Sequence, residues 1–142
     1  MRVLLAHGPN LSQLGTRDPA LYGRETLADL EARVAAVLGE VAAFQSEHEG
    51  ALLERLHAAR RDGTAGVILN PGALTHYSYA LRDAVELLES PVVEVHLSQI
   101  HAREPFRHHS VISGIVPVTI TGAGAYGYHL AALALAHLLG RP

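Results

Sequence analysis

Short apolar runs alternate with segments of helical periodicity along the chain. Runs rich in β-branched residues predict strands at 3–5, 41–45, 67–69, 92–96 and 116–121. Apolar residues spaced three and four apart predict helices at 26–39, 49–61, 76–88 and 125–139. Thr26 precedes the first of these helices, with Asp29 three residues later, which is the arrangement of an N-cap.

This alternation predicts the fold class. Strands that alternate with helices form a parallel sheet with helices on both faces, a three-layer α/β doubly wound domain. For a chain of 142 residues we expect a single domain, residues 1–142, with five parallel strands in the flavodoxin-like order 2-1-3-4-5.

Two connections are unusually long and polar. Residues 7–25 join the first strand to the first helix, whereas such loops usually contain about 2–6 residues. Residues 96–113 hold four of the ten histidines, together with Arg103 and Arg107. Both connections leave the carboxyl ends of predicted strands, as does the turn at 70–72. We therefore expect the three segments to meet at the sheet edge where ligands bind in this fold class.

The residues at this edge suit a small polar acid. Arginines can hold a carboxylate, amides can orient hydroxyl groups, and histidines exchange protons near neutral pH. The candidates are Asn10, Arg17, Tyr22, Asn70, His76, His96, Ser98 and Arg107.

Composition excludes several kinds of chemistry. All 11 basic residues are arginine, so no lysine can form a Schiff base, and the absence of cysteine removes thiolate nucleophiles. A net charge of −3 gives no reason to expect nucleic acid or an anionic membrane as a partner. We find no signal-peptide pattern and no apolar stretch long enough to span a bilayer, and we expect a cytoplasmic protein.

Two further patterns have structural interpretations. His101, His108 and His109 form a cluster, but a zinc site needs about three ligands in a constrained geometry and adjacent histidines usually point apart. We expect no metal there and place the cluster at an interface or around the site. Residues 122–127 match GxGxxG, but they follow the last predicted strand, whereas the dinucleotide-binding motif follows the first. We interpret them as a tight turn.

Four blocks of sequence carry a resemblance to a known family. They contain GPNL at 8–11 with LGTR at 14–17 and LYG at 21–23, QS at 45–46, NPGALTH at 70–76, and EVHLS at 94–98 with FRHHS at 106–110. In this order they are similar to the signature of the type II 3-dehydroquinase family. The resemblance extends over nearly the whole chain.

The resemblance implies an anti elimination of water from 3-dehydroquinate to 3-dehydroshikimate through an enolate, without a metal or other cofactor. Tyr22 would be the base that removes the proton next to the ketone. Because a tyrosine hydroxyl is a weak base, it needs a nearby cation, and Arg17 would supply it. Asn10 would organise this region. His96 would be the general acid that protonates the leaving hydroxyl.

The resemblance also implies how the substrate binds. Asn70 would hold a water against the developing enolate oxygen. The hydroxyls and the carboxylate would bind to His76, Leu97, Ser98 and Arg107. Asp83 would approach the site of a neighbouring subunit, in a dodecamer built from trimers.

The sequence departs from the family pattern at several positions: His7, Ser12, Gln13, Glu47 and Tyr126. None of these changes removes a catalytic position, but those within residues 7–25 bear on loop motion and substrate affinity. The alternative is a non-catalytic flavodoxin-like module that binds a small carboxylate. A flavin or nucleotide protein is disfavoured because Pro9 offers no amide donor after the first strand. Aromatic biosynthesis and quinate breakdown both remain open as the physiological role.

Overall fold

The computed structural model describes residues 2–141. Its sheet consists of β1 (Arg2–His7), β2 (Val41–Gln45), β3 (Thr64–Asn70), β4 (Val92–His96) and β5 (Val118–Thr121). The strand order is β2-β1-β3-β4-β5, and every neighbouring pair is parallel. The fold class and the strand order predicted from the sequence are therefore confirmed.

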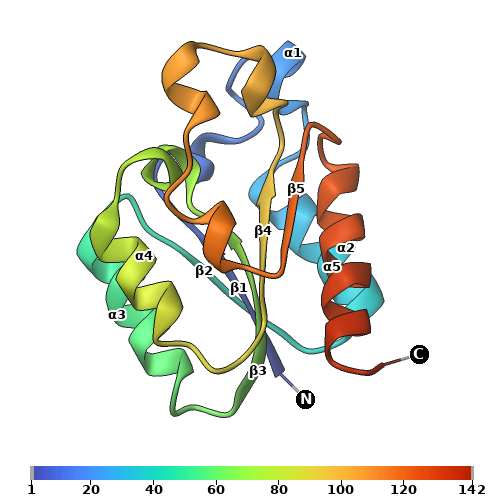
Figure 1. Cartoon of the computed structure of the whole chain (residues 1–142). Coiled ribbons are helices and arrows are strands. Elements are labelled where there is room, and N and C mark those ends of the chain that lie inside the picture. Colours follow the sequence, from blue (N-terminus) through green and yellow to red (C-terminus); the bar gives the residue numbers. More distant parts are fainter. Residues whose placement is uncertain (1, 142) are drawn as a thin grey trace.

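Helices cover both faces of the sheet (Figure 1). The helices α2 (Leu27–Leu38) and α5 (Tyr126–Leu138) pack on one face, and α3 (Glu49–Ala59) and α4 (Tyr79–Glu86) pack on the other. Successive strand side chains point to opposite faces, so Val3 and Leu5 join the core under α2 and α5, while Leu4 and Ala6 join the other. None of the described helices is long and apolar enough to cross a membrane.

One predicted helix begins later than its sequence pattern suggested. The prediction of a helix from His76 to Leu88 is wrong at its start, because a 3-10 turn at Gly72–His76 precedes α4. Ser78 caps α4, and its hydroxyl accepts a hydrogen bond from the Leu81 N–H at 3.0 Å. His76 therefore lies in the turn that follows β3. The cap predicted at Thr26 is confirmed, with Asp29 completing a capping box.

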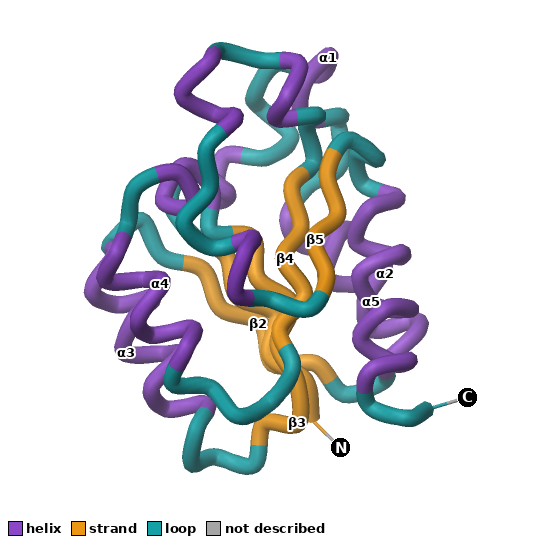
Figure 2. The backbone as a smooth tube through the Cα atoms, viewed as in Figure 1, coloured by secondary structure: helices purple, strands orange, loops and turns teal. Residues whose placement is uncertain are grey.

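The two long connections contain short helical turns above the carboxyl ends of the strands (Figure 2). The first holds a 3-10 turn at Leu11–Gln13 and the helix α1 (Pro19–Tyr22), and the second holds 3-10 turns at Ile100–Ala102 and Pro105–His108. A further 3-10 turn at Ser113–Ile115 lies lower in the view, before the start of β5. The Asp18 carboxylate caps α1, and Gly23 ends it with φ 74°. These contacts place Tyr22 in the last turn of α1.

Two glycines allow the loops after β1 and β3 to touch. A Cβ atom on Gly8 would lie 2.5 Å from the Pro71 carbonyl oxygen, so no side chain fits there. Gly72 has φ 61°, and its Cβ would meet the Pro9 carbonyl oxygen at 3.0 Å. The two loops thus form one continuous wall.

Candidate active site

A pocket lies at the carboxyl edge of the sheet, where the two long connections meet the turn after β3. It encloses about 600 Å³, including space open to solvent. The residues that line it are Pro9, Asn10, Leu11, Arg17, Tyr22, Asn70, Gly72, Ala73, His76, His96, Leu97, Ser98, Ile100, Arg103 and Arg107. The structure therefore brings together every site residue expected from the sequence except Asp83.

Two arginines hold Tyr22. The Arg17 guanidinium lies over its ring, with 3.6 Å between Cζ and the ring centroid. Arg103 Nη2 donates a hydrogen bond to the Tyr22 hydroxyl at 2.8 Å, and Arg103 Nη1 donates to Ser98 Oγ at 3.1 Å. A cation at hydrogen-bond distance from the oxygen stabilises a phenolate more directly than one over the ring. The sequence interpretation assigned this role to Arg17 and gave none to Arg103.

His96 is oriented by a buried carboxylate that the sequence interpretation missed. Glu94 is fully buried on β4, and its side chain contacts His96 Nε2. The hydroxyls of Thr75 and Ser113 donate to the same carboxylate, at 2.6 and 2.7 Å. Burial by itself raises the pKa of Glu94, but hydrogen bonds from His96, Thr75 and Ser113 and the charge of His96 outweigh it, so the net pKa is lowered. Glu94 is thus an anion that leaves His96 Nδ1 available to the pocket.

His76 is a neutral hydrogen-bonding group beside His96. Its Nδ1–H donates to the His109 carbonyl at 2.7 Å, which makes Nε2 an acceptor when the ring is neutral. Burial, followed by the charges of His96 and Arg107, lowers the pKa of His76 despite the bond to His109. Arg107 is held by Glu104 through Nε at 3.2 Å, which leaves its terminal nitrogens for an anion.

The start of the first long connection is tied to β2. Asn10 is the one non-glycine among residues 2–141 with a positive φ, 70°. Its backbone N–H donates to Glu47 Oε2 at 2.9 Å, and Ser12 Oγ donates to Glu47 Oε1 at 2.8 Å. The hydrogen bonds from Asn10, Ser12 and Gln45 lower the pKa of Glu47. Ser12 and Glu47, two of the departures from the family pattern, are therefore partners in one cluster.

His7, another departure, lies beneath the pocket. It is fully buried, and its Nδ1 lies 3.3 Å from the Phe44 carbonyl oxygen. Among residues 2–141, Nε2 has no hydrogen-bond partner. Burial lowers the pKa of His7 to about 4, against the opposing effect of the Phe44 carbonyl. His7 is thus a neutral core residue at physiological pH.

The remaining sequence candidates lie outside the pocket. Asp83 is exposed on α4 and does not line the pocket of its own chain. Within residues 2–141, no three His, Asp or Glu side chains converge as potential metal ligands. The structural interpretation of residues 122–127 is confirmed: Gly122 and Gly124 have positive φ, and a Cβ on Gly122 would lie only 3.2 Å from the Gln99 side chain.

Known proteins resemble this chain along nearly its full length. The family model described as dehydroquinase class II matches residues 1–136. The 3-dehydroquinate dehydratase of Syntrophotalea carbinolica is 50% identical, over 97% of this chain and 96% of that protein. The enzyme of the same name from Bacillus cereus AH187 is 53% identical, over 94% of each chain.

Solved structures of type II dehydroquinases resemble this chain as well. The type II dehydroquinase of Butyrivibrio crossotus superposes with a TM-score of 0.91 at 40% identity, covering 95% of this chain and 97% of that one. The type II dehydroquinase of Propionibacterium acnes gives 0.87 at 43% identity, covering 98% and 96%. The chain therefore belongs to the dehydroquinase class II family.

Proposed function

We propose that the chain is a hydro-lyase that removes water from 3-dehydroquinate to give 3-dehydroshikimate, a step of the shikimate pathway. The observation that carries the proposal is the pairing of two groups in one pocket. Tyr22 is held by two arginines, and His96 is held by a buried carboxylate. This is the base and acid pair that an elimination needs. Family membership and the curated relatives support the same activity.

In the first step, Tyr22 acts as the base. Its phenolate oxygen takes the proton from the carbon next to the ketone, and the electron pair of that C–H bond moves towards the ketone oxygen to give the enolate. Arg103 at 2.8 Å and Arg17 over the ring favour the charged phenolate before the transfer. Asn10 and Asn70 line the pocket as polar groups for the enolate oxygen, with Asn70 acting through a water.

In the second step, His96 acts as the acid. The enolate collapses to the conjugated ketone as the C–O bond breaks, and protonated His96 gives its proton to the departing hydroxyl, which leaves as water. Glu94 stabilises the protonated ring before the transfer. Tyr22 ends with one extra proton and His96 with one fewer, so a proton exchange with solvent resets the pair.

The other pocket residues bind the substrate. Arg107 has its terminal nitrogens free of Glu104 and suits the carboxylate. His76 offers Nε2 to a hydroxyl group. Ser98 shares its side chain with Arg103, so its backbone and that of Leu97 provide the remaining contacts.

A direct assay tests the activity. Purified protein is mixed with 3-dehydroquinate and a chelator, without added metal, and the ultraviolet absorbance of the conjugated enone carboxylate is followed. Rising absorbance is expected, and borohydride added with substrate leaves the activity intact because the chain has no lysine. A flat trace from folded protein would overturn the proposal and favour a carboxylate-binding module without turnover.

We also propose that Asp83 acts at the site of a neighbouring subunit, in a dodecamer built from trimers. Support comes from its exposed place on α4, one helical turn after Tyr79, whose ring is also exposed. Light scattering measures the assembly size. Co-expressed Asp83→Ala and Tyr22→Phe chains then regain activity in mixed assemblies, because a site with an intact Tyr22 can meet an intact Asp83. Mixtures no more active than the separate variants would contradict this role. The cytoplasmic location expected from the sequence stays a prediction.

A further inference from the structure

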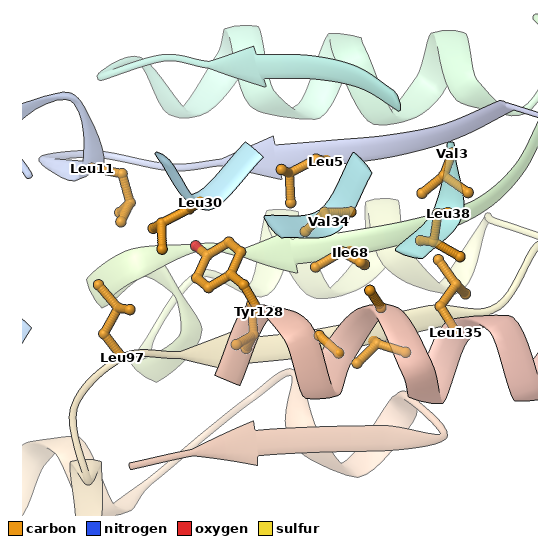
Figure 3. Close-up of a cluster of buried hydrophobic side chains, with 14 of the residues drawn as sticks. Val3, Leu5, Leu11, Leu30, Val34, Leu38, Ile68, Leu97, Tyr128 and Leu135 are labelled. Carbon is orange, nitrogen blue, oxygen red and sulfur yellow. The ribbon is translucent and has the colours of Figure 1, made fainter. Parts of the chain in front are cut away.

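A buried side-chain pair joins the pocket to a helix that contributes nothing else to it. Asn70, at the end of β3, lines the pocket and is 3% exposed. Its Nδ2 donates a hydrogen bond at 3.0 Å to the hydroxyl of Tyr128 on α5, which is fully buried. Figure 3 shows the Tyr128 hydroxyl at the end of the core where Leu11 and Leu97 lie, and both leucines line the pocket.

The orientation of the Asn70 amide is set from both ends. Its Oδ1 accepts a hydrogen bond from the Gly72 N–H at 3.1 Å, so the oxygen must face Gly72 and Nδ2 must face Tyr128. A flipped amide would place two donors against each other at Gly72. Burial raises the pKa of Tyr128, so its hydroxyl remains a neutral acceptor across the working range of pH.

The Tyr128 hydroxyl is itself held by its surroundings. The Tyr128 ring stacks on His7, with 5.7 Å between ring centroids and 17° between planes. Because the ring lies in the core between α2, α5 and the strands, rotation of Tyr128 is blocked and its oxygen is a fixed point.

We infer that Tyr128 is a positioning residue for the proposed dehydration, because its hydroxyl holds the Asn70 amide with the second Nδ2 hydrogen directed to the pocket. Among residues 2–141, Tyr128 is the one hydrogen-bond acceptor of Asn70 Nδ2. The second hydrogen is thus available to the water or oxygen beside the enolate. Without the hydroxyl, the amide loses one of its two side-chain bonds and can rotate about its terminal torsion. This inference rests on the proposed function for its kinetic consequence, but its structural consequence can be measured separately.

The kinetic test is a double-mutant cycle. Tyr128→Phe is expected to lower kcat about 10-fold while KM changes less than about twofold, a fraction of what removing a transition-state donor costs. In an Asn70→Ala background the same substitution is expected to change kcat by less than about twofold, because the group that it positions is gone. The matched control is Tyr126→Phe, since Tyr126 lies on the same helix but is 55% exposed. An equal loss of kcat in both backgrounds would overturn the inference.

The structural test needs no turnover. The chain contains two asparagines, Asn10 and Asn70, so protein labelled with ¹⁵N-asparagine gives two side-chain amide pairs, which single variants assign. Tyr128→Phe is expected to shift the Asn70 pair and to leave the Asn10 pair in place, whereas Tyr126→Phe moves neither. An unchanged Asn70 pair would overturn the inference. If Tyr128→Phe does not fold, hydrogen exchange of the unmodified protein decides. One Asn70 amide hydrogen should then exchange more slowly than the other, and equal rates would count against the inference.

The two tests separate two kinds of failure. If the Asn70 pair shifts in Tyr128→Phe but the unmodified protein has no dehydratase activity, the proposed function fails and the hydrogen bond stands. If the protein is active and the pair does not shift, the function stands and the role of Tyr128 fails.

Discussion

The two sides of the pocket are built differently. Tyr22 lies on α1 within the first long connection, is partly exposed, and is held by the side chains of Arg17 and Arg103. His96 and Asn70 are buried at strand ends, and each is held by a buried side chain, Glu94 or Tyr128. The proposed base is thus fixed by partly buried cations on loops, and the proposed acid by groups inside the core. Changes on the base side should alter activity with little effect on stability, and changes on the acid side should alter both.

The largest effect is expected on the base side. Tyr22→Phe keeps the ring under Arg17 but removes the proton-accepting oxygen, and we expect kcat to fall about 10³-fold with the melting temperature unchanged. Steady-state kinetics and thermal unfolding test this, with Tyr126→Phe as an exposed control. Substantial residual turnover in Tyr22→Phe would defeat the assignment of the base.

The two arginines that hold Tyr22 are expected to have the next largest effect on kcat. Arg103→Ala removes the hydrogen bond to the Tyr22 oxygen, and we expect kcat to fall about 100-fold. Arg17→Ala removes the cation over the ring and should lower kcat by a comparable factor. Steady-state kinetics of the two variants measure the two losses. An unchanged kcat in either variant would remove that arginine from the support of Tyr22.

The acid side should respond in both activity and stability. Glu94→Gln replaces an anion that contacts His96 and accepts bonds from Thr75 and Ser113. We expect kcat to fall about 30-fold, because the protonated ring loses its counter-charge. Unfolding free energy should fall by about 2 kcal/mol, the usual cost of losing bonds to a charged group. Exposed Glu86→Gln is the control, and unchanged stability in Glu94→Gln would break the contrast between the two sides.

Because His7 is buried in the core, its lowered pKa should make the stability of the fold depend on pH. Its folded pKa of about 4 lies below the ordinary histidine value of 6.5, so the unfolded chain binds the proton more tightly. Stability from this group is complete above pH 6.5 and is lost as pH falls towards 4, by about 2 kcal/mol at pH 5. Urea unfolding at pH 7 and pH 5 measures the loss. His7→Asn should be free of it, and an equal loss in the variant would assign it to other groups.

The smallest effect is expected at the start of the first long connection, residues 7–25, where Asn10 and Ser12 donate hydrogen bonds to Glu47. Ser12→Ala removes one hydrogen bond to Glu47, and Glu47→Gln weakens all of them. We expect KM to rise about threefold in either variant, with the double variant no worse than Glu47→Gln, because both act through one exposed cluster. Additive effects on KM would show that Ser12 acts independently of Glu47.

Much of the fold follows from patterns within short windows of sequence. The apolar runs of β1 and β4 and the cap at Thr26 are local signals, and they predicted these strands and the start of α2. The strand order came from the flavodoxin-like fold class that the alternation of strands and helices indicated. The start of α4 was mispredicted because the turn at Gly72–His76 carries the same apolar spacing as the helix that follows it. Ser78, a good N-cap residue, was the available signal.

The polar residues that hold the site were harder to find. Arg103 reaches Tyr22 across 81 residues of sequence, and Tyr128 reaches Asn70 across 58, so no local pattern connects them. Glu94 did have a signal. A carboxylate within the apolar strand Val92–His96 of a sheet covered on both faces must be buried, and a buried carboxylate needs partners. Because Glu94 lies two residues before His96, on the same face of the strand, His96 was the first partner to expect.

The pocket's cations, Arg17, Arg103 and Arg107, have a practical consequence. Since the chain has no lysine side chain, amine-directed dyes, crosslinkers and immobilisation resins find no side-chain target in the sequence. Dicarbonyl reagents such as phenylglyoxal, which modify guanidinium groups, can reach the pocket. The enzyme should therefore tolerate coupling to an amine-reactive support with its turnover intact and be inactivated by arginine-directed labelling.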